Sequence, residues 1–181
     1  MLDRSYPPLA DARFRLEPLT PGHADAMFAA VERDRAHLRR WLSWVDVTTT
    51  RAAVDASIAT FRERAAAGTD RVYLLMADER VIGGIGVHGI DTANRHAEIG
   101  YWLAEDQQGR GVMTSACRAV TAYGFRELQM HRLEIRCAVE NRRSRAIPER
   151  LGYAHEATIA GFLFLGGRFH DVAVYALLNP D

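Results

Sequence analysis

The fold of this chain is decided by the stretch Glu98-Ile-Gly-Tyr-Trp-Leu-Ala-Glu-Asp-Gln-Gln-Gly-Arg-Gly-Val-Met-Thr114. It runs from a strand-like segment, through a loop without apolar residues, into a segment with helical spacing. Gly109 and Gly111 permit backbone conformations in which successive N–H groups point at one ligand, and the helix N-terminus adds partial positive charge. The stretch therefore predicts a phosphate site built from backbone or, equally well, a glycine-rich helix start that holds no ligand.

The segments on both sides of this stretch alternate between strand-like and helix-like patterns. Strands are predicted over residues 13–19, 71–77, 81–89, 97–104, 132–139, 153–165 and 168–178. Helices are predicted over residues 20–33, 36–42, 51–67, 110–128 and 144–151. Gly166-Gly167, between the last two strands, is a strong hairpin signal. No repeat, low-complexity tract or linker interrupts this order, so we expect a single α/β domain over residues 1–181.

The basic residues exclude several chemistries, because all 23 of them are arginine. Without lysine, the chain can form neither a Walker A phosphate loop nor a lysine Schiff base, which includes the usual anchorage of pyridoxal phosphate. A hydrophobic fraction of 48% and a charged fraction of 25% are typical of a soluble globular protein. Cys117 and Cys137 lack metal-type spacing, and we expect two buried thiols in a reducing cytosol.

The formal net charge is zero, so no global field attracts a membrane or DNA. This zero hides an asymmetry along the chain. Residues 1–106 hold 13 arginines and 16 acids, a balance of −3, whereas residues 107–181 hold 10 arginines and 7 acids, a balance of +3. The C-terminal part is therefore better suited to an anionic ligand. Neither a membrane-spanning apolar run nor a signal-peptide pattern is present, which favours a cytoplasmic protein.

Three catalytic or cofactor-binding motifs are excluded by their context or spacing. Gly84-Ile-Gly-Val-His-Gly89 has dinucleotide-binding spacing, but it lies in a strand-like run and is followed by a loop and another strand instead of a helix. His155-Glu156 starts like a zinc-protease helix, but Ile159 stands where the second histidine belongs. The G-x-S-x-G sequence of a serine hydrolase does not occur. We therefore expect no metal site and no dinucleotide cofactor.

Two sequence blocks resemble the GNAT superfamily of N-acetyltransferases. Gln108-Gly-Arg-Gly111 resembles its acetyl-CoA signature, Q/R-x-x-G-x-G/A, with Met113 in place of the last small residue. Asn141-Arg-Arg-Ser144 and the following Leu-Gly-Tyr153 resemble a second block of the RimJ/RimL-like branch, the ribosomal-protein N-terminal acetyltransferases. The resemblance covers residues 13–178. It implies the GNAT fold: a mixed, mostly antiparallel central sheet, splayed between its fourth and fifth strands and flanked by helices.

The resemblance also implies acetyl-CoA as the cofactor. Its pantetheine arm is expected between the strands at 97–104 and 132–139, with its thioester carbonyl at the backbone N–H groups of Trp102 and Leu103, which would stabilise an oxyanion. Its pyrophosphate is expected on the glycine loop. Asn141 is expected to bond the pantetheine chain, to cap the following helix, or both. The remaining cofactor-binding residues are expected to be Gln108, Gly109, Arg110, Gly111, Val112, Met113 and Thr114.

Two residues are candidates for acid–base catalysis. Ser144 is either the general acid that protonates the leaving thiolate or a helix N-cap. Glu98 matches the position of a catalytic glutamate in several enzymes of this fold, and is either the general base or a strand glutamate paired with arginine. Relatives in the RimL-like branch often carry an acid about ten residues after the second block, but residues 160–167 contain none. Asp171 and His170 are more distant substitutes.

The resulting function is acetyl transfer from acetyl-CoA to a primary amine, most plausibly a protein α-amino group of the ribosomal-protein type, in a ternary complex. Acetylation of a small amine, such as an antibiotic or polyamine, is the alternative, and a weakly catalytic CoA-binding module that docks to the ribosome or RNA is another. Trp41 and Trp44 either line the acceptor site or pack in the core. Arg142, Arg143 and Arg145 either meet the CoA 3′-phosphate, meet another partner, or are solvated. A homodimer is possible.

Overall fold

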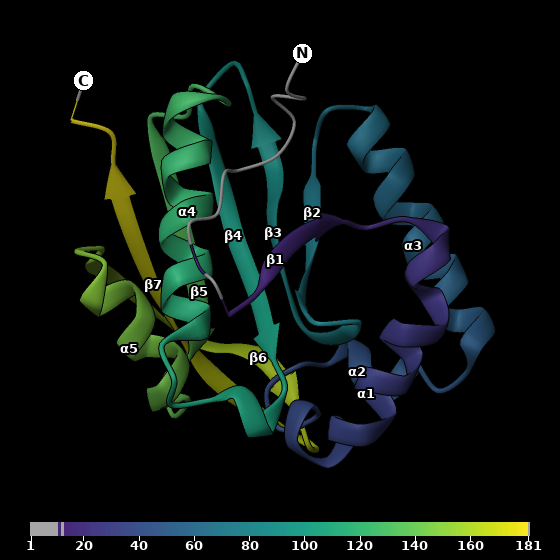
Figure 1. The fold of residues 1–181 in the computed structure, drawn as a ribbon. Coiled ribbons are helices and arrows are strands. Elements are labelled where there is room, and N and C mark those ends of the chain that lie inside the picture. The colour runs from purple at the N-terminus through teal and green to yellow at the C-terminus, as the bar shows by residue number, and fades with distance from the viewer. Residues whose placement is uncertain (1–10, 12, 181) are drawn as a thin grey trace.

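The computed structural model describes residue 11 and residues 13–180, and they build one mixed sheet with helices on both faces (Figure 1). The seven strands lie in the order β1-β2-β3-β4-β5-β7-β6. They are β1 (Arg15–Pro18), β2 (Arg71–Ala77), β3 (Arg80–Asp91), β4 (His96–Leu103), β5 (Arg132–Ala138), β6 (Ala154–Leu165) and β7 (Arg168–Leu178). All neighbouring pairs are antiparallel except β4 and β5.

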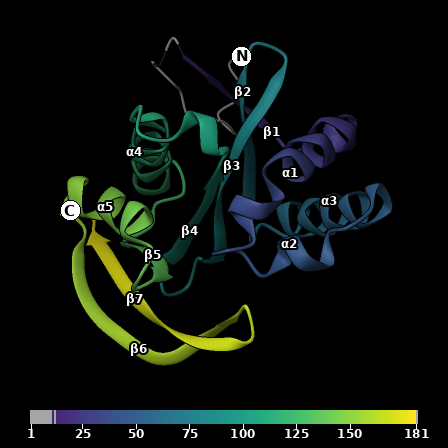
Figure 2. The ribbon, with the colours of Figure 1, turned by 90° about the horizontal axis from the view of Figure 1, so that it is seen from below.

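The helices divide between the two faces of the sheet, as the view in Figure 2 shows. One face carries α1 (Ala24–Leu38), α2 (Trp44–Val47) and α3 (Arg51–Ala66), and the other carries α4 (Val112–Arg126) and α5 (Arg142–Arg150). Short 3-10 turns, η1 (Pro21–His23) and η2 (Glu105–Gln107), precede α1 and the glycine loop. No helix among the described residues is long and apolar enough to cross a membrane.

Each layer of helices seals its own core. On one face, Ala116 and Val120 of α4 pack with Ile135 of the sheet. On the other face, Met27 of α1 and Ile58 of α3 pack with the opposite side of β2 and β3. Burying one such large apolar side chain stabilises the fold by about 1.5–3 kcal/mol, so the two cores fix the sheet between its helices.

The sheet opens between its only parallel strands. β4 and β5 pair over three positions, the last of which joins Glu98 to Glu134. Beyond this position β4 continues to Leu103 and β5 to Ala138 without further pairing. The splay expected between the fourth and fifth strands is therefore present. Past Glu98 and Glu134, the edges of β4 and β5 that face each other do not pair.

Two expected helix boundaries are wrong. The helix expected over residues 36–42 does not exist as a separate element, because α1 continues to Leu38. Leu38 is buried with Val31 and Val45, so it belongs to the α1 face and holds the following turn against α2. The helix expected to start at Ser144 begins at Arg142, since the Asn141 side chain accepts a hydrogen bond from the N–H of Ser144 (3.2 Å) and caps it.

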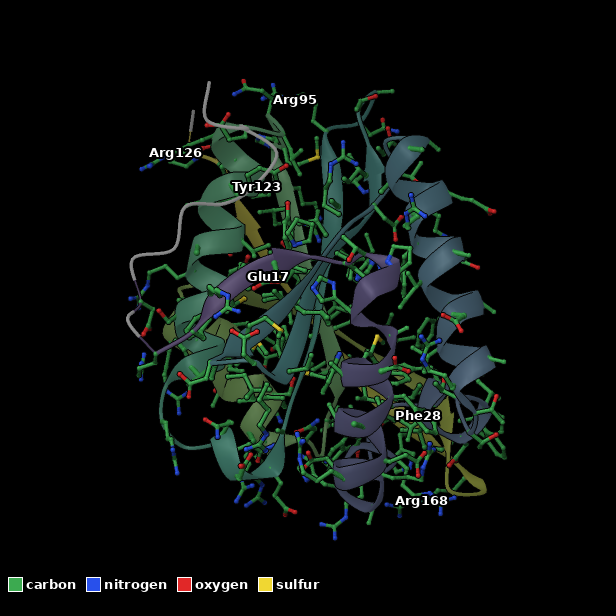
Figure 3. The ribbon with its side chains drawn as sticks, turned by 45° about the vertical axis from the view of Figure 1, so that its right-hand side comes forward. Glu17, Phe28, Arg95, Tyr123, Arg126 and Arg168 are labelled. Atoms are coloured by element: carbon green, nitrogen blue, oxygen red, sulfur yellow. The ribbon has the colours of Figure 1, made fainter. Side chains whose placement is uncertain are left out.

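The β6–β7 hairpin curves away from the rest of the sheet (Figure 2). Its turn lies at the Gly166-Gly167 pair, as expected. Figure 3 shows Arg168, at this turn, at one end of the molecule, with Arg95 and Arg126 at the other. The glycine loop before α4 lies at the hairpin end, so the two ends of α4 face different surroundings.

Candidate active site

The glycine loop presents a run of free backbone donors. Gly109 and Gly111 both have φ of +74°, a left-handed conformation that glycine adopts without strain. Gln108 donates its N–H to Glu105 (3.2 Å), and the next donor to a backbone carbonyl is Ser115, which bonds Gly111 (3.0 Å). Across the described residues, no backbone carbonyl accepts from the N–H groups of residues 109–114. These donors converge at the N-terminus of α4 and fit a pyrophosphate.

Side chains from two helices clamp this loop. Asp34 of α1 accepts a hydrogen bond from the N–H of Glu105 (3.1 Å). The amide of Gln108 contacts His37 Nε2 through its nitrogen (2.6 Å) and accepts from Arg143 Nη1 through its oxygen (2.5 Å). Gln108 therefore ties α1 to α5 through its side chain and orients the loop.

The residues after the glycines explain the departure from the family signature at Met113. Val112 and Met113 are only 3% and 4% exposed, and their side chains fill the core beneath α4. Their backbone N–H groups stay available at the helix end. The backbone carbonyl of Arg110 accepts a hydrogen bond from the side chain of Arg13, and the side chain of Arg110 is exposed. The loop thus offers backbone N–H groups to a ligand, and Met113 keeps its own N–H available although its side chain is larger than the residue in the family signature.

Backbone alternation distinguishes the two residues expected in the opening of the sheet. Ala104 donates its N–H to Ile82 on β3 (2.8 Å). Since N–H direction alternates along a strand, Leu103 directs its N–H to the opposite side, toward the splay, whereas Trp102 directs its N–H toward β3. Leu103, rather than Trp102, is therefore the donor that faces the opening.

Trp102 contributes its ring to the opposite face. The indole lies over Gly84, where an added Cβ would be 2.5 Å from Trp102 Nε1. It meets Trp44 edge-on, with ring centroids 6.2 Å apart. Gly84 and Gly86 lie inside β3 against the rings of Trp102 and His88, where a side chain would clash, and no nucleotide-binding helix starts there. Trp41 is partly buried in the turn before α2.

Ser144 lies on the α4 and α5 side of the opening. Its hydroxyl donates to Tyr101 Oη (3.3 Å), and Tyr101 donates to the carbonyl of Ser144 (3.2 Å). Burial raises the pKa of Tyr101 well above its ordinary value, so this phenol is neutral. Ser144 is not the helix N-cap, a role that Asn141 fills, and its hydroxyl is free of any capping bond.

Glu98 lies where β4 and β5 separate. Its side chain is 40% exposed, and Oε2 lies 3.5 Å from Arg136 Nε. Burial raises the pKa of Glu98 above its ordinary value, and the positive charge of Arg136 opposes this rise. A partly exposed carboxylate of raised pKa can both pair loosely with arginine and accept a proton, so the two expected roles are compatible.

A histidine that the sequence reading passed over stands beside Glu98. His88 on β3 is the cross-strand partner of Glu98. A carboxylate oxygen of the buried Asp70 lies 2.8 Å from Nδ1 of His88. The imidazole ring lies over Gly86, where an added Cβ would be 2.5 Å from Nε2 of His88. A carboxylate partner fixes the orientation of an imidazole. Asp70 and His88 are eighteen residues apart, and no local spacing indicates their contact.

The candidate acid and the candidate base reach the opening from opposite faces. Side chains alternate along β4, so Glu98 and Trp102 face α1 and α3, whereas Tyr101 faces α4. Tyr101 packs against the core beneath α4, and Trp102 packs against the core beneath α1. A ligand that crosses the splay would therefore meet Ser144 on one side and Glu98 on the other.

The other expected substitutes are engaged elsewhere. Asp171 accepts a hydrogen bond from the N–H of Gly161 (2.8 Å) and stabilises an irregularity in β6. His170 is 5% exposed and contacts Glu140 (3.3 Å). Within the described residues, no group of three or more His, Cys, Asp or Glu side chains could hold a metal ion.

The three arginines after Asn141 have different surroundings. Arg145 donates to Tyr175 Oη (2.8 Å) and to the carbonyl of Val139 (3.2 Å), so it supports the hairpin. Arg143 binds Gln108 in the glycine loop, and Arg142 is exposed. Arg143 is therefore the member of this group placed beside the phosphate loop.

Comparison with known proteins agrees with this geometry. A family model described as "Acetyltransferase (GNAT) domain" matches residues 13–154. The chain is 34% identical over 171 residues to "Putative ribosomal N-acetyltransferase YdaF" of Bacillus subtilis (strain 168), covering 90% of each chain. It is 26% identical over 165 residues to "Ribosomal-protein-serine acetyltransferase" of Escherichia coli (strain K12), covering 89% of this chain and 90% of that one.

Solved structures agree at the level of the whole fold. A RimL ribosomal L7/L12 α-N-protein acetyltransferase in complex with coenzyme A superposes with a TM-score of 0.91 at 26% identity, covering 95% of this chain and 97% of that chain. The crystal structure of a probable acetyltransferase gives a TM-score of 0.88 at 32% identity, covering 93% of this chain and 94% of that chain. The likeness extends over the mixed sheet, with its parallel β4–β5 pair, and the helices that flank it.

Proposed function

The chain belongs to the GNAT acetyltransferase family and is an N-acetyltransferase, and from this premise we propose that it acetylates the α-amino group of a protein N-terminus, of the ribosomal-protein type. The observation that carries the proposal is similarity along nearly the whole chain to proteins named as ribosomal-protein acetyltransferases. Such similarity includes the α1 and α2 face, where the acceptor would approach.

The donor is acetyl-CoA, which supplies an acetyl thioester. The N–H groups of residues 109–114 would hold its pyrophosphate, and the amide of Asn141 would bond its pantetheine arm. Leu103 would direct its N–H at the thioester carbonyl, where a fixed donor stabilises developing negative charge. Arg143 stands beside the loop and supplies positive charge for the phosphates. A lysine-free chain can build this site, since backbone and arginine suffice.

Glu98 is the proposed general base. An α-amino group has a pKa of about 7.7–8.0, compared with about 10.4 for a lysine side chain, so it needs less help to lose its proton. Because the pKa of Glu98 is raised, it lies closer to the pKa of the amine, and this favours proton transfer between the two groups. His88, held by Asp70, is the cross-strand partner of Glu98 and is the residue we propose to bind a water beside that carboxylate.

Ser144 is the proposed general acid on the opposite face. Its hydroxyl could donate a proton to the departing thiolate and regain one from solvent as CoA leaves, while Tyr101, to which it is bonded, holds it in place. The neutral state of Tyr101 keeps a proton on the phenol at physiological pH. The chain thus separates proton acceptance and donation across the sheet, which suits direct transfer in a ternary complex.

Replacing Glu98 with glutamine tests this assignment. Release of free thiol from acetyl-CoA, in the presence of a peptide with a free α-amine, should fall by about 10²-fold or more for Glu98→Gln. The melting-temperature rise that acetyl-CoA produces should stay unchanged. If the rate and its pH profile match those of the wild type, Glu98 is not the base.

A small-amine acceptor is the second candidate. One relative is "Spermidine N(1)-acetyltransferase" of Vibrio cholerae, at 28% identity, but it matches only 53% of this chain. The shorter match makes this acceptor the weaker proposal. A cytoplasmic location and a homodimer remain part of the proposal, since a single chain does not test them.

A further inference from the structure

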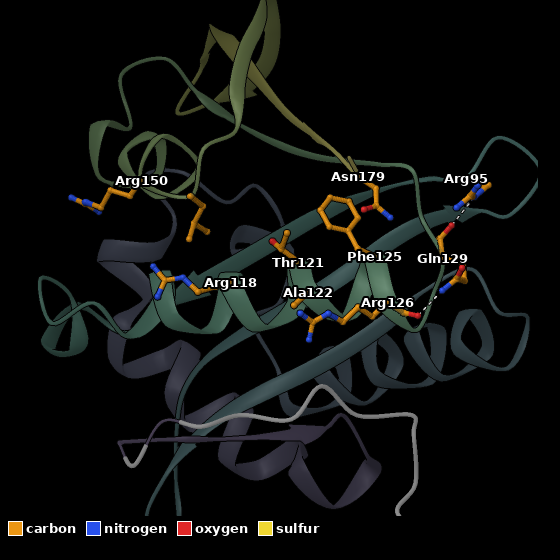
Figure 4. Close-up of a pocket in the computed structure, with 10 residues that line it drawn as sticks. Arg95, Arg118, Thr121, Ala122, Phe125, Arg126, Gln129, Arg150 and Asn179 are labelled. Carbon is orange, nitrogen blue, oxygen red and sulfur yellow. Dashed lines mark hydrogen bonds between the residues drawn. The ribbon is translucent and has the colours of Figure 1, made fainter. Parts of the chain in front are cut away.

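A hollow of about 740 Å³ lies on the molecule at the far end of α4 from the glycine loop. We call it the cationic hollow, because Arg95, Arg118, Arg126 and Arg150 line it and no acidic residue does (Figure 4). Arg118 and Arg126 extend from α4, Arg150 from the end of α5, and Arg95 from the turn between β3 and β4. In Figure 4, Arg118 lies toward the start of α4, and Phe125 and Arg126 lie toward its end.

The arginines of the cationic hollow have no counter-charge in the described part of the chain. None of the four forms an ion pair there, whereas arginines elsewhere commonly do: Arg132 binds both Glu134 and Glu156 (2.7 and 2.6 Å). Four exposed guanidiniums around one hollow, without a carboxylate partner among the described residues, produce a local positive potential in a chain of zero net charge.

The ends of two helices explain only part of this charge. Arg126 and Arg150 lie in the last turns of α4 and α5, where a cation offsets the partial negative charge of the helix terminus. Arg118 lies in the middle of α4, and Arg95 lies outside any helix. Arg95 donates Nε to the carbonyl of Gln129 (2.8 Å), which holds the guanidinium at the rim with its terminal nitrogens free.

The spacing of these groups suits a chain of phosphates with a base between them. Arg118 and Arg126 are eight residues apart on one face of α4, about 12 Å along the helix axis. Ala122 lies midway between them and Phe125 lies next to Arg126; the Phe125 ring packs against the core beneath α4 and is partly exposed. Cationic groups along a groove, with an aromatic ring between them, are what single-stranded nucleic acid binds: phosphates take the cations, and a base stacks on the ring.

We propose that the cationic hollow binds the backbone of single-stranded nucleic acid. Its arginines lie on both sides of the apolar floor, which matches a strand that crosses the hollow better than a single compact anion. An acidic peptide would use the arginines but leave Phe125 without a flat partner. Guanidinium also pairs with phosphate through two parallel hydrogen bonds, which favours phosphate over a point charge.

This site is separate from the proposed active site. Along the axis of α4, Arg118 is about 10 Å and Phe125 about 21 Å from Gly111. No residue of the cationic hollow belongs to the glycine loop, to the opening of the sheet, or to the surroundings of Glu98. Nucleic acid and acetyl-CoA could therefore bind at the same time, and the proposal does not depend on the acceptor that the enzyme uses.

Fluorescence anisotropy with a labelled oligouridylate of about ten nucleotides tests the proposal on the whole chain. The logarithm of the association constant should fall with the logarithm of salt concentration with a slope of about −2 to −3, as expected for three or four phosphate contacts. The double variant Arg118→Glu/Arg126→Glu should bind at least about tenfold more weakly and with a shallower slope.

The control is Arg62→Glu, which makes half of the double variant's change in net charge. Arg62 lies on α3, is exposed, and has no carboxylate partner among the described residues, so it changes the net charge without touching the hollow. Each variant should keep the wild-type melting temperature and its rise with acetyl-CoA, which shows that the fold and the donor site persist.

Four results would overturn the proposal. They are no binding of the oligonucleotide by the wild type at low salt, equal weakening by Arg62→Glu, displacement of the oligonucleotide by inorganic phosphate at an equal phosphate concentration, and tighter binding of an oligoglutamate peptide than of the oligonucleotide. The last two would assign the hollow to a free anion or to an acidic protein segment.

Discussion

At the scale of single residues, the charge next to Glu98 sets the pH dependence of the reaction. Burial raises its pKa, so the rate should rise with pH through a midpoint above the ordinary range of glutamate. Arg136, 3.5 Å away, lowers that pKa, and the adjacent Glu134 raises it. Removing Arg136 should therefore move the midpoint to higher pH. The variant Arg136→Gln, followed by kcat/KM from thiol release against pH, measures this shift.

Arg39→Gln serves as the control for that experiment. Arg39 also pairs with a carboxylate, Asp46 (3.1 Å), but it lies in the turn after α1. Its loss should leave the midpoint in place. If the midpoint on the acidic side of the kcat/KM profile stays at the same pH in Arg136→Gln, a group other than Glu98 controls the rate.

The sequence could identify some of these residues but not their partners. Glu98 and Ser144 lie on the two sides of the opening because of local alternation and a short motif, both of which are visible in the sequence. The Asp70–His88 contact joins two strands through a register that no local pattern encodes. The same holds for the bond between Ser144 and Tyr101, since it depends on how α5 packs on β4.

At the scale of elements, the glycine loop and the start of α4 form one device. Gly111→Asp should abolish the rise in melting temperature caused by acetyl-CoA, because a carboxylate and a strained backbone would both enter the phosphate site. Gly68→Asp is the matched control: Gly68 also has a left-handed φ (+81°), with open space around it, but it lies after α3. Both variants should lose about 1–2 kcal/mol of stability, and only Gly68→Asp should keep the response. A response that survives Gly111→Asp would contradict the phosphate-loop assignment.

The elements themselves were largely predictable. The strands were predicted from alternation and the hairpin from Gly166-Gly167, since these signals are local. The region between α1 and α2 was not predicted, because an unbroken apolar face carries α1 to Leu38, Trp41 follows in a turn, and Trp44 begins α2. The splay came from the family resemblance alone, since the point where β4 and β5 stop pairing depends on tertiary packing.

At the scale of the whole molecule, the split of charge along the chain has a spatial counterpart. The basic C-terminal part supplies the loop before α4, with its neighbour Arg143, and three of the four arginines of the cationic hollow. One helix, α4, thus has a proposed anion site at each end. The acidic N-terminal part supplies α1, α2 and α3, on the face where a cationic amine would approach.

The oligomeric state is a further prediction at this scale. Phe162, Phe164 and Phe169 on the β6–β7 hairpin are 55%, 56% and 68% exposed. Exposed apolar patches of this kind are common at protein interfaces. We expect a mass of twice 20.3 kDa by light scattering at micromolar concentration. A monomer mass at every concentration tested would contradict the homodimer.

The central claim is acetylation of a protein α-amine, and a comparison of acceptors tests it most directly. Thiol release from acetyl-CoA should be measured with N-terminal peptides of ribosomal proteins, with the same peptides blocked at the α-amine but containing a lysine, and with spermidine. We predict turnover of the free peptides, with mass spectrometry locating the acetyl group on the α-nitrogen, and little turnover of the other two. Turnover of spermidine without turnover of any free peptide would contradict the account.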